Sequence, residues 1–89
     1  MTFKVLLDPR ATKALRKLDE VNKARIKKAL GELAGDPYKA GETLHPSDYW
    51  KIRAGDYRAI FRIYSDKKEV RVLFIGHRKN VYDDFSKIL

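Results

Sequence analysis

The sequence predicts a small mixed α+β fold, in which a pair of helices covers one face of a short antiparallel sheet. The first half of the chain repeats apolar residues at helical spacing, and the second half alternates apolar and polar residues at strand spacing. Turn sequences divide the second half into three strands. The chain has 89 residues, close to the lower comfortable size for independent folding, so we expect one domain over residues 1–89.

A short strand is expected at residues 3–7, followed by a helical hairpin. Asp8 is placed to cap the first helix, and Pro9 suits its first turn because no amide hydrogen is needed there. Two apolar stripes follow, the first made of Ala11, Ala14, Leu15 and Leu18 and the second of Ile26, Leu30 and Leu33. The sequence "LDEVN" between the stripes indicates a corner, and "GDP" at residues 35–37 ends the second helix. Residues 35–48 are expected to form a loop.

Three antiparallel strands are expected at residues 49–53, 57–65 and 69–77, with a short amphipathic helix at 81–89. Gly55, as the first central residue of the first turn, favours a type II′ turn. If Tyr64 also pairs with Glu69, the alternation of side chains assigns each strand residue to one of two faces. The face predicted to pack on the helices holds Trp50, Ile52, Tyr57, Ala59, Phe61, Ile63, Val70, Val72 and Phe74. The other face holds Lys51, Arg53, Arg58, Ile60, Arg62, Arg71, Leu73, Ile75 and His77.

The second face is unusual because it places cations beside one another. Arg53 and Arg58 are predicted to lie directly opposite each other, and like charges in such a pair destabilise a sheet by up to ~1 kcal/mol. This pattern suits a polyanion whose phosphates meet the cations while its bases or sugars lie on the apolar strip between them. A solvated charged face is the alternative interpretation.

The overall charge points to the same class of partner. Twenty Lys and Arg residues against twelve Asp and Glu residues give a formal net charge of +8, with a sequence pI near 9.8. Such a balance favours nucleic acid, an acidic protein or a membrane surface as partner. The outer face of the helices adds six cations, either a solvated surface or a second grip on phosphates: Lys13, Arg16, Lys17, Lys23, Lys27 and Lys28.

Several function classes are not expected. The chain has no cysteine, which rules out disulfides and thiolate metal sites and makes a reducing cytoplasm the expected location. The longest uninterrupted apolar run, Val72–Ile75, is four residues, so no segment is expected to span a membrane. Of the possible anionic partners, a membrane is the one not expected. His45 has no neighbouring histidine or acid cluster at metal-binding spacing, and no cofactor motif is present, so no metal and no cofactor are expected.

Cleavage of RNA is a reaction that cations, a tyrosine and a histidine could catalyse. In this reaction the 2′-OH attacks the adjacent phosphorus in line with the departing 5′ oxygen. Arginine forks match phosphate oxygens, and crowding by arginines disfavours the charged form of a lysine, which makes a lysine a candidate base. DNA lacks the 2′-OH and would not be cleaved by this mechanism.

The sequence resembles the RelE branch of the RelE/ParE toxin superfamily, close to archaeal-type RelE proteins, over essentially the whole chain. The resemblance lies in "PRATKALRKLDEVNKARIKKAL", "YWKIRAGDYRAIFRIY" and "VLFIGHRKNVYDDFSKIL", with "KIRAGDYRAIFRI" followed by "IGHRKNVY" as the most specific part. It implies a ribosome-dependent mRNA endonuclease that enters the decoding site and is neutralised by a cognate antitoxin. The positive charge, with an amphipathic ending at Phe85, Ile88 and Leu89, makes an acidic antitoxin a plausible partner.

The resemblance also implies roles for individual residues. Lys51 and Arg53 match two cations on the family's first central strand, and Arg58 matches the phosphate-contacting arginine of its "GYR" element. Arg78 falls on the arginine that follows the last strand, and Tyr82 on the C-terminal tyrosine that orients the nucleotide. We therefore predict Lys51 as proton acceptor, Arg53 and Arg58 as phosphate stabilisers, Arg78 as leaving-group support, and Tyr82 as nucleotide orienter. Substrate-binding roles are predicted for three further residues of the cationic face: Arg62, Arg71 and His77.

Two other functions stay open at the level of the sequence. One is a ParE-like toxin that inhibits DNA gyrase by protein contact without catalysis. The other is a basic nucleic-acid-binding module without chemistry, for which alanine at Lys51 and Arg58 would lower affinity modestly and reduce the salt dependence of binding.

Overall fold

The computed structural model describes residues 2–44 and 48–86, apart from the side chains of residues 83–85. The loop histidine His45 and the apolar residues Ile88 and Leu89 of the C-terminal ending lie outside this described part, as does the side chain of Phe85. In chain order the elements are β1 (Lys4–Leu7), α1 (Pro9–Arg16), α2 (Glu20–Gly35), α3 (Pro37–Ala40), β2 (Glu42–Thr43), β3 (Trp50–Ala54), β4 (Tyr57–Tyr64), β5 (Glu69–His77) and α4 (Val81–Ser86). No helix in these described ranges is long and apolar enough to cross a membrane.

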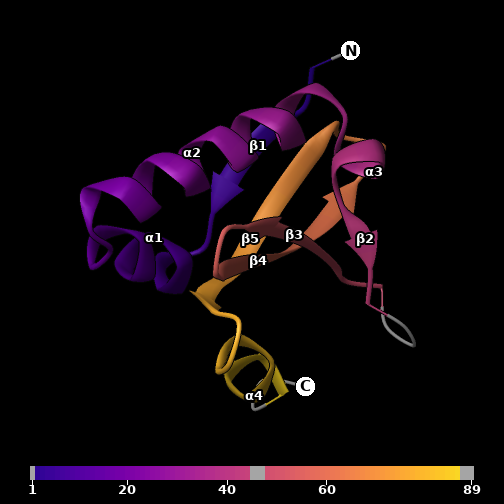
Figure 1. Ribbon diagram of the computed structural model, residues 1–89. Helices are drawn as coiled ribbons and strands as arrows, with labels where there is room; N and C mark the ends of the chain where they lie inside the picture. The colour runs from indigo at the N-terminus through magenta and orange to yellow at the C-terminus, as the bar shows by residue number, and fades with distance from the viewer. Residues whose placement is uncertain (1, 45–47, 87–89) are drawn as a thin grey trace.

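The strands form one sheet in the order β1-β5-β4-β3-β2. The predicted antiparallel meander of β3, β4 and β5 is confirmed, and β1 completes the sheet by pairing in parallel with β5. Helices α1 and α2 lie together on one side of the sheet, whereas α4 follows the end of β5 close to the C-terminus (Figure 1). The mixed α+β prediction is therefore confirmed.

The helical hairpin begins as its sequence predicts. The Asp8 carboxylate accepts hydrogen bonds from the backbone N–H of Arg10 at 2.9 Å and from the Arg10 Nε at 3.1 Å. These hydrogen bonds from Arg10 hold the pKa of Asp8 below its usual value. Pro9 occupies the first turn of α1. The corner between α1 and α2 lies at residues 17–19, so it overlaps only the first two residues of "LDEVN", and α2 already begins at Glu20.

The hydrophobic core lies between this hairpin and one face of the sheet. Ile26 and Leu33 of α2 pack in the same cluster as Phe61 of β4, and all three are fully buried. Burying side chains of this size stabilises a fold by about 1.5–3 kcal/mol each. The other sheet residues of the cluster include Ile52, Ala54, Ala59, Val70 and Val72, with Trp50, Tyr57 and Ile63 partly buried beside them. The predicted helix-facing side is thus confirmed for these residues.

The segment at residues 35–48, expected as a loop, contains two further elements. Asp36 ends α2 and also caps α3, because its carboxylate accepts the N–H groups of Tyr38 and Lys39 at 3.1 and 3.2 Å. Pro37 then suits the first position of α3. The chain continues into β2, where Glu42 pairs with Lys51. The loop prediction was wrong for α3 and β2.

A β-bulge in β5 corrects the predicted faces near its end. Phe61 pairs with Val72 and Ile60 pairs with Phe74, so Leu73 has no counterpart on β4. One extra residue reverses the alternation beyond it. Ile75 consequently joins the core under the helices, and Phe74 packs on the opposite face with Ile60. The predicted faces of Phe74 and Ile75 were wrong, and His77 moves with them, as described below.

Candidate active site

The hairpin of β3 and β4 places two arginines opposite each other. Arg53 pairs with Arg58 in the observed register, as predicted, and their Cβ atoms are therefore ~4.5–5.5 Å apart. The register follows from a two-residue turn in which Gly55 has φ of +63° and Asp56 keeps a negative φ, as a type II′ turn requires. Arg53 is exposed and Arg58 is half-buried, so both guanidinium groups can meet an anion above this face.

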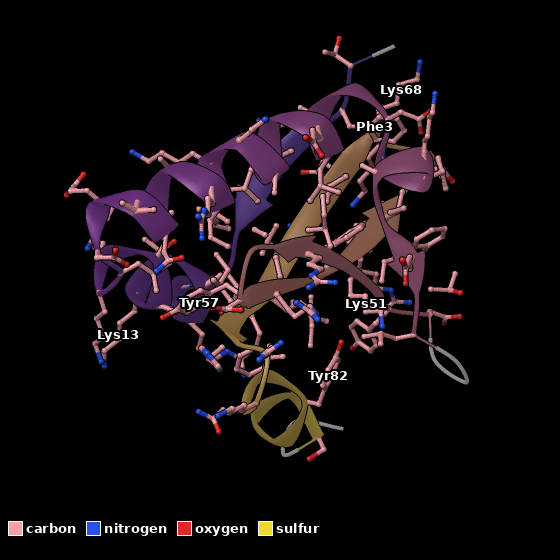
Figure 2. All side chains as sticks on the ribbon, viewed as in Figure 1. Phe3, Lys13, Lys51, Tyr57, Lys68 and Tyr82 are labelled. Atoms are coloured by element: carbon pink, nitrogen blue, oxygen red, sulfur yellow. The ribbon has the colours of Figure 1, made fainter. Side chains whose placement is uncertain are left out.

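Lys51 lies two residues before Arg53 on the same face, between a carboxylate and an aromatic ring. Its Nζ is 3.9 Å from the Glu42 carboxylate of β2, and 5.8 Å from the centre of the Tyr82 ring. Figure 2 shows the Tyr82 side chain of α4 extending toward Lys51. The Lys51 side chain is 31% exposed, which leaves it accessible from solvent while it contacts both neighbours.

Close packing of α4 on β5 sets the position of Tyr82. Gly76 lies opposite Arg58 on the sheet, and a Cβ at Gly76 would be 3.3 Å from the Cβ of Val81. Val81 is buried and packs with Ile60, so it covers the centre of the face that carries the cations. The next residue along α4 is Tyr82, which this packing holds over Lys51 at 37% exposure.

Arg78 is attached to the β3–β4 turn by two contacts with one residue. Its backbone N–H donates to the Asp56 carbonyl at 2.8 Å, and its Nε is 4.0 Å from the Asp56 carboxylate. Because Asp56 is two residues from Arg58, these contacts hold Arg78 at the same end of the sheet as the arginine pair. Both groups of the ion pair are more than half exposed, so its contribution to stability is small.

A cavity of about 290 Å³ opens beside these cations at the edge of β3. Its lining comes from the sheet, from α2 and from the α3–β2 segment: Glu32, Ala40, Glu42, Lys51, Ile52, Arg53 and Arg58. Neither carboxylate of this cavity was predicted from the sequence. Glu42 sits on a two-residue strand that has no recognisable pattern, and Glu32 sits on the exposed side of a helix where acidic residues are common.

Arg62 and Arg71 occupy a separate part of the same face. They pair with each other across β4 and β5, with buried Ile60 between them and Arg58 along β4. The Arg62 guanidinium lies 5.7 Å from the Tyr49 ring centre and 5.6 Å from the Tyr64 ring centre, and it pairs with Asp48 at 3.8 Å. The Arg71 guanidinium lies 5.9 Å from the Tyr64 ring centre.

His77 does not share the face of the cations. After the bulge it pairs with Tyr57, and the two rings contact edge to face with centres 5.5 Å apart. Tyr57 packs against the core under the helices, so His77 lies on that side of the sheet. Its Nδ1 accepts the backbone N–H of Lys79 at 3.2 Å. The predicted position of His77 on the cationic face was wrong because the alternation reverses at Leu73.

The assembled group therefore contains Lys51, Arg53, Arg58 and Tyr82, with Arg78 at the same end of the sheet. It can bind a phosphate through two arginine forks, hold a ring or base against Tyr82, and exchange a proton at Lys51 or Glu42. Among the described residues, no group of three or more His, Cys, Asp or Glu side chains is placed to hold a metal ion.

Comparisons with known proteins show which family the chain matches. The family model for the ParE toxin of type II toxin–antitoxin systems, parDE, matches residues 5–82. No curated protein matches the chain.

Solved structures of RelE toxins are similar in fold. The RelBE2 toxin–antitoxin complex from Mycobacterium tuberculosis matches with 26% identity and a TM-score of 0.81, covering 88% of this chain and 100% of that chain. A mutant of the Escherichia coli toxin RelE in the free state matches with 29% identity and a TM-score of 0.78, covering 100% of both chains. The archaeal RelE–RelB complex from Pyrococcus horikoshii matches with 25% identity and a TM-score of 0.73, covering 88% of this chain and 97% of that chain.

Proposed function

We propose, from the premise that this chain belongs to the ParE toxin family of type II toxin–antitoxin systems, that it cleaves messenger RNA on the ribosome. The resemblance to the RelE/ParE superfamily predicted from the sequence is confirmed by the family match and by the RelE structures of the same fold. The catalytic activity and the roles of individual residues are our proposal.

The observation that carries the proposal is the convergence of Lys51, Tyr82 and the Arg53–Arg58 pair on one exposed face. A gyrase inhibitor that acts only by protein contact has no need for adjacent cations of the same sign on a sheet, which oppose folding. A phosphate that becomes more negatively charged during a reaction is stabilised by such a group.

The reaction is an internal transfer of the phosphoryl group within the RNA. The 2′-OH loses its proton, the bond from the 2′ oxygen to phosphorus forms, and the bond from phosphorus to the 5′ oxygen breaks. The 5′ oxygen then takes a proton, which leaves a 2′,3′-cyclic phosphate and a 5′-OH. Arg53 and Arg58 stabilise the phosphorane charge, and Arg78 stabilises the departing oxygen. Tyr82 orients the nucleotide by stacking.

Proton transfer from the 2′-OH has two candidate acceptors, because Lys51 and Glu42 are 3.9 Å apart. Lys51 is the acceptor that we favour, because its Nζ lies on the same face as the arginine pair that would hold the phosphate. Glu42 either shares this role or holds Lys51 in position. Arg62 and Arg71 bind RNA outside the reacting group, and His77 has no place in the proposed site because it lies on the other side of the sheet.

A cell-free translation extract tests the proposal. Added toxin should cut the message within codons that ribosomes occupy, and should leave the same RNA intact when ribosomes are absent. Inhibited translation with an intact message would contradict the assignment as a nuclease.

Gyrase inhibition is a second candidate function, and the ParE description of the matching family model favours it. Supercoiling by purified gyrase distinguishes the two. Loss of supercoiling at stoichiometric toxin, with message left intact in translation extracts, would favour the gyrase inhibitor.

We also propose a cognate antitoxin as the partner of this chain. The solved relatives include RelE toxins in complexes with RelB antitoxins, and the net charge of +8 favours an acidic protein. Ribosomes and messenger RNA are the proposed substrate complex, which implies action in the cytoplasm. Normal growth on expression of the chain alone, without an acidic copurifying protein, would weaken the antitoxin proposal.

A further inference from the structure

We propose that Arg62 and Arg71 form a second phosphate-binding site, which holds the message about 13 Å along the sheet from the phosphate that is cleaved. The inference rests on the proposed function and deepens it, because it sets the length of RNA that the cationic face engages. It concerns a pair of guanidinium groups outside the group proposed to contact the reacting phosphate.

The register of β4 and β5 and one aromatic ring bring the pair together. Arg62 lies directly opposite Arg71, and Tyr64 is the next residue of β4 on the same face. The Arg62 and Arg71 guanidinium groups lie 5.6 and 5.9 Å from the centre of the Tyr64 ring. A cation over an aromatic ring is attracted to it, so this shared ring keeps two like charges together that would otherwise repel each other.

Both guanidinium groups are accessible from solvent and held in place. Arg71 is exposed, and the Arg62 side chain is 42% exposed. Arg62 also lies 5.7 Å from the centre of the Tyr49 ring, which contacts it from β3. Its one ion pair, with Asp48 at 3.8 Å, involves a side chain that is 87% exposed, so a phosphate can replace this carboxylate at little cost.

The acidic residues around Arg71 are not paired with it. Among the described side chains, neither Arg71 nor Glu69, which lies opposite Tyr64, forms an ion pair. Asp8 caps α1 and accepts hydrogen bonds from Arg10, which lower its pKa more than the charge of Arg71 does. The arginine pair therefore keeps a positive charge that an anion can balance.

The pair lies in line with the reacting group along β4. Arg58 and Arg62 are four residues apart on one face, which is about 13 Å of strand. Lys51, with Tyr82 over it, pairs with Ile60 halfway between them. Consecutive phosphates are ~3.4 Å apart along a stacked strand and about twice that in an extended one, so the two sites are roughly two to four nucleotides apart.

A phosphodiester fits two opposed guanidinium groups. It has two free oxygens, and each can accept hydrogen bonds from one guanidinium fork. RNA also carries its phosphates at regular spacing, so one strand can occupy the reacting group and the second site together. This alignment on one face favours RNA over an acidic peptide as the occupant.

Binding of short 2′-O-methyl oligouridines to the purified toxin tests the inference without cleavage. Their blocked 2′ oxygen cannot attack the phosphorus, and their length increases from two to eight nucleotides. Competition against a labelled probe gives the Kd at each length. Longer probes bind in more registers, but this advantage is the same for wild type and variants, so the ratio of their Kd values reports the second site.

Two double variants assign the dependence on length to the pair. Arg62→Gln with Arg71→Gln should bind the shortest probe within about threefold of wild type, and the longest on the order of tenfold more weakly. The salt dependence of binding to the longest probe should fall by about 0.7 in the slope of log affinity against log salt, as for one phosphate contact on a single strand. Arg62→Lys with Arg71→Lys keeps both charges and should keep this slope.

Lys39→Gln with Lys67→Gln is the matched control. It also removes two exposed cations, one from α3 and one from the turn between β4 and β5. It should change the Kd by less than about threefold at every length, because neither side chain belongs to the pair. Circular dichroism and thermal unfolding establish that each variant is folded.

Each outcome decides the inference. Equal Kd values for wild type and the glutamine variant of the pair, a loss of the same size at every length, or the same length-dependent loss in the control would overturn it. If the pair serves an acidic protein instead, the glutamine variant will keep its affinity for the probes and lose affinity for an all-glutamate peptide, which also overturns it. A loss confined to the longer probes supports the inference even if the toxin cuts no message; in that case the proposed nuclease function fails and the second phosphate site stands.

Discussion

The Nζ of Lys51 lies 5.8 Å from the centre of the Tyr82 ring, so a strand near the edge of the sheet and the C-terminal helix meet at one point. The two residues are far apart in the sequence, and they come together because α4 places Tyr82 over β3. The packing of Val81 on Gly76 and Ile60 fixes this helix on the sheet, and Tyr82 follows directly. The proposed site therefore depends on how α4 docks as well as on the hairpin.

Removing the Tyr82 ring should impair cleavage more than removing its hydroxyl. Stacking of a base on an aromatic side chain contributes about 1–3 kcal/mol, so Tyr82→Ala should lower the cleavage rate by roughly ten- to a hundredfold. Tyr82→Phe keeps the ring and should stay within a few-fold of wild type. Primer extension on a translated message measures both rates, and equal losses for the two variants would assign the role to the hydroxyl instead.

A side chain at Gly76 should displace α4. In Gly76→Ala the new Cβ would lie 3.3 Å from Val81, so Val81 must move and Tyr82 will move with it. We expect thermal unfolding at lower temperature, by an amount equivalent to about 1–3 kcal/mol, and slower cleavage.

Gly31→Ala is the control for this substitution. Gly31 lies in α2, and a Cβ added there would have no atom within 4 Å, so alanine should stabilise the helix by ~0.5–1 kcal/mol and leave cleavage unchanged. A Gly76→Ala variant that unfolds at the same temperature as Gly31→Ala would show that α4 tolerates the added methyl group.

Substitutions of Lys51 and Glu42 should identify the proton acceptor. If Lys51 takes the proton, Lys51→Ala should slow cleavage by about a hundred- to ten-thousandfold, and Glu42→Gln should have a much smaller effect. The opposite ranking would assign the role to Glu42. Lys67→Ala, in the exposed turn between β4 and β5, is the control for a lost surface charge.

Asp8 should make the stability of the protein depend on acid pH. Because hydrogen bonds from Arg10 lower its pKa in the folded state, the ionised carboxylate stabilises the fold above the unfolded pKa of 3.8. This contribution is lost as the pH falls below 3.8 and through the lower pKa of the folded state. Asp8→Asn keeps a capping side chain but cannot titrate.

Chemical denaturation at several pH values tests this prediction. The difference in free energy of unfolding between wild type and Asp8→Asn should decrease from pH 6 to pH 2, whereas Asp8→Ala should lose about 1 kcal/mol of capping at pH 6. A difference that does not change with pH would contradict the role of the Asp8–Arg10 contact.

Much of the fold follows from local chemistry in the sequence. Asp8-Pro9 marks the start of α1, and Gly55 fixes a two-residue turn whose register places Arg53 opposite Arg58. Side-chain alternation then assigns β3 and β4 to the correct faces, since neither strand contains an extra residue.

The remaining features depend on tertiary structure. The bulge at Leu73 lies within the apolar run Val72–Ile75, where either face accepts an apolar residue, so the pattern shows no break. β2 is defined by its hydrogen bonds to β3, and its two residues are too few to show the alternation of apolar and polar residues that marks a strand. The cavity and its two carboxylates follow from the short β2, which is why the sequence did not reveal Glu32.

Induced expression in a bacterial host, followed by primer extension on a cellular message, tests the central claim most directly. Wild-type toxin should produce new message ends within translated codons soon after induction, and the Arg53→Ala, Arg58→Ala double variant should produce at least roughly a hundredfold fewer of them at equal protein level. Growth arrest with no new message ends, or equal numbers of ends from the double variant, would contradict the proposal that this face cleaves RNA.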